Sequence, residues 1–356
     1  MFSMKNCTSL LLLVLFFTDC KKSSTDSPTL EINNKDQHGV FLAGMQKNDA
    51  GNSVATYWKN GVASQLPGGD PAAEAMDIIV DGEDIYACGY AIEWPGGRTI
   101  AKYWKNGYTA ELNNSVNGSF ASAMAMSGDQ LYISVTEQTS SDSMYSYLWK
   151  NNDILPLSNG PKSAAVYAVA ASGMNVFAGG LEPTSAGKGN AISWSNGSVA
   201  TLGVAGKSTY VKDVFVSGED QYACGAQTDT TTMEMVAVLW KNGVRTILTD
   251  GSMNAEATAV FVQGTDVYVV INEHDPNGIL PLTVKLWKNG NVTVVSNGNA
   301  HAQGTGVFVS GADVYVVFNE QHGNIAHVPK LWKNGIISDV TDGSREAYVY
   351  SIFVQP

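Results

Sequence analysis

Apolar residues in this chain occur in short runs at consecutive positions, with neither the alternation of a half-exposed strand nor the spacing of an amphipathic helix. Examples are residues 259–262 (Ala-Val-Phe-Val), 267–270 (Val-Tyr-Val-Val) and 307–309 (Val-Phe-Val). Runs of this length, rich in β-branched and aromatic residues and separated by Gly, Asn or Asp, indicate strands. Since successive side chains on a strand point to opposite faces, both faces of these strands are expected to be covered.

A tryptophan recurs every 45 to 47 residues and marks a repeated unit. The seven positions are Trp58, Trp104, Trp149, Trp194, Trp240, Trp287 and Trp332, and five of them stand in an intact Trp-Lys-Asn-Gly. Asn-Gly between apolar runs predicts a tight hairpin, because a type I′ turn needs positive φ at both central residues. Each Trp therefore belongs to a strand that pairs with the strand after the turn.

A second hairpin recurs in the same register, and a glycine marks its turn. The glycines are Gly82, Gly128, Gly173, Gly218, Gly264 and Gly311. Two hairpins per unit make a four-stranded antiparallel sheet of about 45 residues, which is the size of one blade of a β-propeller.

The two ends of the repeat region complement each other. Residues 39–44 match the second strand of the glycine hairpin without its first, and residues 347–354 match the first strand without its second. Pairing them completes a seventh blade and leaves no open edge in the ring. The sequence thus predicts an all-β fold, a seven-bladed β-propeller of four-stranded antiparallel blades over residues 37–356, closed by pairing of the N- and C-terminal strands.

The order of an inner hairpin, a loop and an outer hairpin with a Trp resembles kelch-type propellers. The Trp and Asn-Gly repeats also resemble the HAF repeats of bacterial extracellular proteins. The resemblance covers the chain after residue 36, although the doubled glycine of kelch units occurs only at Gly179-Gly180. It implies an architecture and no activity.

Several conspicuous residues are explained by the repeat itself. The recurrent tryptophans are expected to pack between blades, and the lysines that follow them to form a solvated rim. Cys88 and Cys224 occupy equivalent positions in the Tyr-Ala-Cys-Gly of two units three steps apart. Because that separation is too large for a disulfide, we expect two buried free thiols.

The first 19 residues have the features of a signal peptide. Lys5 precedes an apolar run of eight residues, from Leu10 to Phe17, which is too short to span a bilayer. The run ends at Phe17-Thr18-Asp19-Cys20, followed by Lys21-Lys22-Ser23-Ser24.

This ending resembles the lipobox of bacterial lipoproteins, in particular those of Bacteroidetes. The resemblance implies a signal peptide over residues 1–19, a lipid-modified Cys20 that anchors the protein to a membrane, and a flexible tether over residues 20–36. It also implies a place in the bacterial cell envelope, as an outer-membrane lipoprotein on either side of that membrane. The alternative is an ordinary secretory signal with an incidental Cys.

Composition narrows the range of partners. The chain has 21 basic and 33 acidic residues, so its net charge is −12. A chain this acidic is repelled by phosphate backbones, and we expect no nucleic-acid partner. Its 44% hydrophobic and 15% charged residues suit a β-rich exported protein with a sizeable core.

Histidines and carboxylates gather near the C-terminus, in two neighbouring units. They are Glu273, His274 and Asp275 in one intra-blade loop, Glu320 and His322 in the next, His301 between the two units, and His327 at the start of a following strand. Imidazole with carboxylate can act as general acid and base, which makes His274, His301, His322, Glu273 and Glu320 the catalytic candidates. The same chemistry can hold a divalent metal, the one cofactor considered, with His274, His322 and Asp275 as ligands. The spacing fits no standard zinc motif, and the alternative interpretation is polar residues at strand ends.

One tryptophan lies outside the repeat. Trp94 stands in the loop Glu93-Trp94-Pro95-Gly96-Gly97-Arg98, on the face where propellers usually bind ligands. An aromatic ring flanked by Pro and Gly can serve as a stacking platform for a sugar or a peptide, with Glu93 and Arg98 beside it. Packing within the loop is the alternative.

These features are compatible with three functions. The first is a non-enzymatic envelope lipoprotein whose propeller presents a binding face to an extracellular glycan or an envelope protein. The second is a polysaccharide lyase or hydrolase that uses the His and carboxylate residues. The third is a structural subunit of an outer-membrane complex. Whether the chain is an enzyme is left open by the sequence, and the absence of a recognisable catalytic motif favours the first hypothesis.

Overall fold

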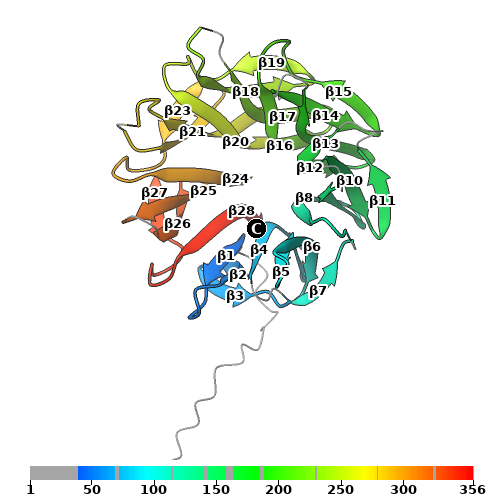
Figure 1. The fold of residues 1–356 in the computed structure, drawn as a ribbon. Helices are drawn as coiled ribbons and strands as arrows, with labels where there is room; N and C mark the ends of the chain where they lie inside the picture. The colour runs from blue at the N-terminus through cyan, green and yellow to red at the C-terminus, as the bar shows by residue number, and fades with distance from the viewer. Residues whose placement is uncertain are drawn as a thin grey trace, which may run out of the picture. The chain divides into compact units, whose positions relative to one another are not determined.

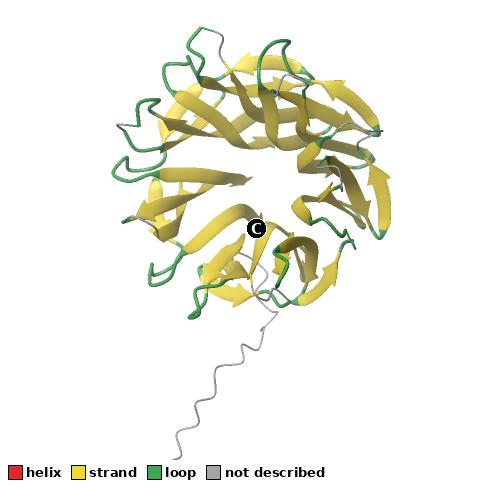
Figure 2. Cartoon of the chain, in the orientation of Figure 1, coloured by secondary structure: helices red, strands yellow, loops and turns green. Residues whose placement is uncertain are grey.

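The structure, a computed structural model, is entirely β in the part of the chain that it describes (Figure 2). The described residues are 39–68, 72–113, 115–139, 143–157, 163–184, 188–228, 231–278, 280–323 and 326–355. The predicted signal peptide, Cys20 and the tether lie outside them.

Within these ranges, twenty-eight strands form seven four-stranded antiparallel sheets, which are the blades of a propeller (Figure 1). Blade 1 consists, from its innermost strand to its outermost, of β28 (Ala347–Gln355), β1 (Gly39–Lys47), β2 (Ser53–Lys59) and β3 (Val62–Gln65). Blade 2 consists, in the same order, of β4 (Ala72–Asp81), β5 (Asp84–Glu93), β6 (Arg98–Lys105) and β7 (Tyr108–Glu111). Blade 3 consists of β8 (Ser119–Ser127), β9 (Gln130–Gln138), β10 (Met144–Lys150) and β11 (Asp153–Pro156).

The remaining blades repeat this order. Blade 4 consists of β12 (Ala165–Ser172), β13 (Asn175–Pro183), β14 (Gly189–Ser195) and β15 (Ser198–Thr201). Blade 5 consists of β16 (Thr209–Ser217), β17 (Asp220–Thr228), β18 (Met235–Lys241) and β19 (Val244–Ile247). Blade 6 consists of β20 (Asn254–Gln263), β21 (Asp266–His274), β22 (Thr283–Lys288) and β23 (Asn291–Val294). Blade 7 consists of β24 (Ala302–Ser310), β25 (Asp313–His322), β26 (Ala326–Lys333) and β27 (Ile336–Asp339).

The ring closes as the sequence predicts. Strand β28 pairs antiparallel with β1 over almost the whole of both strands, from Gly39 opposite Gln355 to Gln46 opposite Ala347. Figure 1 shows β28 beside β1 and facing the centre of the ring, next to β4. The last strand therefore supplies the inner edge of the first blade, and the prediction of a seven-bladed ring closed in this way is confirmed.

The recurrent tryptophans hold neighbouring blades together. Trp58, Trp104 and Trp240 are almost completely buried. The indole Nε1 of Trp104 donates to the backbone carbonyl of Pro67 (2.8 Å), and that of Trp240 donates to Leu202 (3.1 Å). In both cases the acceptor follows the outermost strand of the preceding blade. Packing between blades, rather than a ligand platform, is thus the role of these residues.

The perimeter contains a repeated polar contact that the sequence did not predict in full. In blade 2 the Lys105 ammonium forms an ion pair with Asp84 (2.7 Å) and lies 4.9 Å from the centroid of the Tyr86 ring. Asn106, at positive φ in the Asn-Gly turn, donates to the same carboxylate (2.7 Å). Blades 5, 6 and 7 repeat the ion pair and the ring contact, with Lys241, Lys288 and Lys333. The side chains of these lysines are about half exposed, so the solvated rim also carries a paired charge on four of the seven blades.

Cys88 and Cys224 are buried and free, as predicted. Burial raises the pKa of both thiols well above the usual value, with the nearby charges of Asp77 and Asp213 acting in the same direction. Such thiols are poor nucleophiles. Among the described residues, no helix has the length and apolar character needed to cross a membrane.

Candidate functional site: the central channel

The inner strands of all seven blades enclose a cavity of about 530 Å³ on the axis of the ring. Its wall is formed by β28, β4, β8, β12, β16, β20 and β24, whose places around the centre are visible in Figure 1. A volume between roughly 300 and 1,000 Å³ is typical of sites for small ligands. The side chains that the inner strands direct towards this space therefore decide what the ring could bind.

Every inner strand has a β-bulge at the same place. The extra, unpaired residues are Met76, Ser122, Tyr167, Lys212, Thr258, Thr305 and Tyr350, and all of them line the cavity. A bulge re-aims the side chains next to it. In blade 5 the bulge depends on Gly225, because a Cβ there would lie 2.0 Å from the Tyr210 carbonyl oxygen. This glycine belongs to the Tyr-Ala-Cys-Gly motif, which explains why the motif ends as it does.

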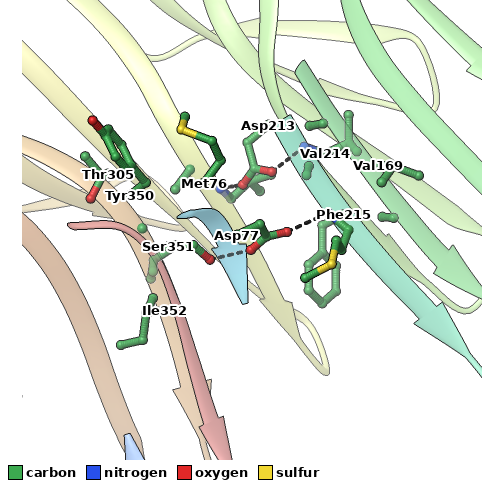
Figure 3. A pocket seen from close by; sticks show the side chains of 18 of the residues that line it. Met76, Asp77, Val169, Asp213, Val214, Phe215, Thr305, Tyr350, Ser351 and Ile352 are labelled. Carbon is green, nitrogen blue, oxygen red and sulfur yellow. Dashed lines mark hydrogen bonds between the residues drawn. The ribbon is translucent and has the colours of Figure 1, made fainter. Parts of the chain in front are cut away.

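Two aspartates follow the bulges of blades 2 and 5 and border the cavity (Figure 3). Asp77 accepts hydrogen bonds from the backbone of Ile78 (2.8 Å) and Met124 (2.7 Å), and from the Ser351 hydroxyl. Since Ile78, Met124 and Ser351 lie on three different blades, this carboxylate joins three inner strands.

Asp213 has the corresponding role in blade 5. It accepts hydrogen bonds from the backbone of Val214 and from that of Val260 in the next blade, both at 2.8 Å. Burial raises the pKa of Asp213 to about 7, and the charge of Asp77 adds to the effect. The pKa of Asp77 is also raised by burial. Both carboxylates are occupied by contacts between strands, so we assign them to the stability of the ring rather than to ligand binding.

A polar arc, part of which (Gln303, Tyr348 and Tyr350) lines the cavity, lies where the inner strands begin, and we call it the channel mouth. It consists of Tyr210, Glu256, Gln303, Tyr348, Tyr350 and Glu74, which come from blades 5, 6, 7, 1 and 2 in ring order. Tyr210 donates to Glu256 (2.8 Å), Tyr348 to Gln303, and Tyr350 to Glu74 (2.6 Å). Each of these bonds crosses a blade junction.

The tyrosines of the channel mouth are half-buried, and burial raises the pKa of all three. For Tyr348 the pKa is about 12, and the charges of Glu256 and Glu74 contribute to it. Both glutamates therefore lie near the same phenol. The Tyr348 ring also contacts Tyr350 (4.8 Å between centroids) and His327 (5.5 Å), which adds a third ring to this part of the wall.

The channel is strongly asymmetric at its other end. Blades 5, 6, 7 and 1 contribute the contacting phenylalanines Phe215, Phe261, Phe308 and Phe353, with adjacent centroids 4.8 to 5.3 Å apart. At the matching positions blades 3 and 4 have only Ala125 and Ala170, which also line the cavity. Large side chains therefore fill one side of the channel, and small ones leave space on the other.

The predicted histidine sites are dispersed over the loop face. His274 and His322 are exposed, and the exposed His301 accepts a hydrogen bond from the Leu282 backbone through Nδ1 (3.0 Å). Glu273 forms an ion pair with Lys285. His327 pairs with Glu346 (3.5 Å) beside the channel mouth.

Glu320 and His322 are a predicted pair that the structure brings together. The His322 Nε2 lies 3.1 Å from the buried Glu320 carboxylate, which is also 3.6 Å from Lys330. In the described part of the chain, no three His, Cys, Asp or Glu side chains come close enough to hold a metal ion. The catalytic and metal hypotheses for this cluster, including Asp275, stay predictions without a gathered site.

The Trp94 loop, on the same face, is held by polar contacts. Arg98 binds the Glu93 carboxylate through Nε and Nη2 (2.9 and 2.6 Å) and donates to the Ser115 carbonyl (2.8 Å). The charges of Glu93 and Arg98 thus compensate each other and fix the loop. Trp94 itself is 73% exposed, so packing within the loop does not account for it. A role in stacking on a ligand stays a prediction.

The channel mouth was not predicted from the sequence. Its signal was nevertheless present, two residues before each bulge, where the seven units read Glu, Phe, Ala, Tyr, Glu, Gln and Tyr. The next position in each unit is Ala, Val or Gly. The residues two positions before the bulges thus vary in charge and size, whereas those one position before are uniformly small. This difference indicates that the first set does not pack between blades.

Solved structures of other propellers share the fold. The chain is similar to the β-propeller domain of the Trilobed protease from Pyrococcus furiosus, described as having an open velcro topology (TM-score 0.58, 9% identity, 87% of this chain and 96% of that one). It is also similar to a puromycin-hydrolyzing peptidase of Mycobacterium tuberculosis (TM-score 0.57, 10% identity, 86% and 52%) and to the Pyrococcus horikoshii acylaminoacyl peptidase (TM-score 0.57, 12% identity, 85% and 51%).

These similarities concern the fold alone. The chain is a seven-bladed β-propeller like those of the peptidases, and it spans about half the length of the two whole enzymes. No family model matches the sequence, and no curated protein does.

Proposed function

We propose that this protein is a non-enzymatic binding propeller of the bacterial envelope, which takes the end of an extracellular glycan at its channel mouth. The observation that carries the proposal is the polar arc of tyrosines and carboxylates above a cavity of about 530 Å³. At the perimeter, four of the seven blades repeat one set of contacts. In this arc, by contrast, the residues at corresponding positions differ in charge and size.

The chemistry of the arc suits a sugar. Aromatic rings cover the apolar faces of sugar rings, while carboxylate and amide oxygens accept hydrogen bonds from hydroxyl groups. Tyr348 and Tyr350 supply adjacent rings, and Glu74 and Glu256 supply acceptors. The exposed Trp94 on the same face could contact a further part of a longer chain. Anchoring through Cys20 at the outer membrane belongs to the proposal and would place the propeller where glycans are encountered.

A panel of polysaccharides and oligosaccharides tests this function. The purified protein is assayed with each for retardation in native affinity gels and for new reducing ends. Retardation without cleavage supports the proposal. New reducing ends would overturn it in favour of an enzyme, and the histidine cluster would then be the first target. Neither retardation nor new reducing ends with any sugar would favour a protein partner instead.

Two substitutions locate the binding. Tyr350→Ala removes one ring and the donor to Glu74, and it is expected to abolish retardation. Trp94→Ala changes an exposed loop residue and is expected to weaken the binding of long chains only. Melting curves of both variants control for folding. Loss of binding in Trp94→Ala but not in Tyr350→Ala would move the site from the channel mouth to the loop.

A further inference from the structure

The channel mouth has a surplus of hydrogen-bond acceptors. Each of the three tyrosine hydroxyls donates its one hydrogen bond within the arc, to Glu256, Gln303 or Glu74. A carboxylate has about four lone-pair positions. Tyr210 satisfies one of them at Glu256, and Tyr350 together with the neighbouring Tyr90 satisfies at most two at Glu74. A ligand that fits this surface must therefore bring donors.

The channel mouth also has uncompensated negative charge. In the described part of the chain no ion pair involves Glu74 or Glu256. Glutamates elsewhere in the protein have such partners, as Glu111 does in Lys102 (3.0 Å) and Glu273 in Lys285. Among the described residues, the one basic side chain that lines the cavity is Lys212, at the bulge next to Asp213. Two glutamates without an ion-pair partner thus lie at the channel mouth and a single lysine lines the cavity, in a protein whose net charge is −12.

We infer that the channel mouth recognises a protonated amine, carried by an amino sugar at the end of the glycan. An ammonium group brings three donors and a positive charge, which is what both observations require. The Tyr348 and Tyr350 rings add favourable cation–π contacts. This inference rests on the proposed function and narrows its ligand class.

The arrangement of the arc explains why a sugar amine fits better than a lone cation. Glu74 and Glu256 lie on blades 2 and 6, and two further blades lie between them. Those two blades supply Tyr348, Tyr350 and Gln303. A ligand that reaches both carboxylates must therefore extend across this span, with hydroxyls or amines at both ends and an apolar face between them. An oligomer of glucosamine has this form.

Calorimetric titration of the full chain with three oligosaccharides of equal length tests the inference. They are a glucosamine oligomer, its N-acetylated form, and a glucose oligomer that has hydroxyls but no nitrogen. We expect the glucosamine oligomer to bind at least roughly 10-fold more tightly than the other two, since hydrogen bonds to charged groups are the stronger ones. Equal affinity for all three would overturn the inference and leave the proposed function intact. No binding of any would count against both.

Substitutions at the channel mouth and in the cavity should either weaken or strengthen binding of the glucosamine oligomer. Glu256→Gln and Glu74→Gln keep the shape and remove the charge. Each is expected to weaken binding of the glucosamine oligomer roughly 10- to 100-fold and binding of the glucose oligomer by a much smaller factor. Lys212→Met removes the opposing charge and should strengthen glucosamine binding. Glu219→Gln, in the turn at the far end of β16, is the matched control and should change nothing. Unaltered affinity in both glutamate variants would overturn the inference, and tighter binding of a lysine-rich peptide than of the sugar would assign the amine to a protein.

Discussion

The perimeter of the ring and its central channel are built from the same seven repeats but follow different rules. At the perimeter, blades 2, 5, 6 and 7 share one ion pair, one aromatic contact and one Asn-Gly turn. In the channel, the seven residues two positions before the bulges are of five different types. The two middle strands of each blade have to repeat because they pack on the neighbouring blades, whereas the inner strands face a cavity and are free to differ. Repetition here reports on assembly, and departure from it marks the region where we propose that a ligand binds.

The largest effect should come from breaking the repeat at a blade junction. Trp240→Ala removes a buried indole and its bond to Leu202, and we expect a loss of about 3–5 kcal/mol in the free energy of unfolding. Denaturant titration measures it. The matched control is Trp94→Ala, since Trp94 is exposed and outside the repeat, and its effect should stay below about 0.5 kcal/mol. Similar losses in the two variants would contradict the distinction between the two kinds of tryptophan.

The next effect concerns aspartates, whose pKa shifts have opposite signs in the two regions. Burial raises the pKa of Asp213 from 3.8 to about 7, so the native state binds more protons than the unfolded state over that interval. The stability contributed by this group is therefore complete below about pH 4 and is lost as the pH rises towards 7. At about 1.4 kcal/mol per unit, the loss amounts to at most about 4 kcal/mol.

Asp213→Asn should make the free energy of unfolding less dependent on pH in this interval. Denaturant unfolding at several pH values between about 4 and 8 measures this dependence. Asp84→Asn at the perimeter is the opposite case. The hydrogen bond from Lys105 lowers the pKa of Asp84, so its contribution is present above about pH 4 and disappears on acidification. A profile of Asp213→Asn that parallels the wild type would show that the channel aspartate is not the titrating group.

The smallest effect is expected from a single perimeter contact. Lys105→Met removes the ion pair with Asp84 and the contact with Tyr86, both at the surface. Pairs of this kind contribute less than about 1 kcal/mol, and salt screens them. Thermal unfolding at low and high ionic strength should show a small loss that shrinks with salt. A loss that is large, or independent of salt, would mean that packing rather than charge dominates at the rim.

The same division explains what the sequence could and could not predict. Trp-Lys-Asn-Gly and the turn glycines encode local hairpins, so the number of blades, their strands and the closing pair could be deduced from them. The variable column of the channel mouth is visible in the sequence, but its contacts could not be deduced, because Tyr350 and Glu74, 276 positions apart in the chain, meet only when the ring closes. The register of the inner strands also depends on β-bulges, and the local pattern of apolar and polar residues does not predict which residue is left unpaired.

The histidines show where prediction from the repeat fails. The sequence predicts that they gather because their loops belong to adjacent units, and the order of the blades does put these loops on one face. In the structure, however, all three histidines are exposed and have separate surroundings: His301 accepts a hydrogen bond from the Leu282 backbone, and His322 lies beside Glu320. Position in a repeat predicts the face of the ring but not contact between side chains.

Closure by β28 has a consequence for the order in which the fold is completed during synthesis. Blades 2 to 7 are each formed from one continuous stretch of chain and can assemble in order as the polypeptide grows. Blade 1 must wait for the last strand, which also delivers Tyr348, Tyr350 and Phe353 to the channel. A nascent or truncated chain therefore has neither a closed ring nor a complete channel mouth, and the step that completes the architecture is the same step that creates the proposed binding site.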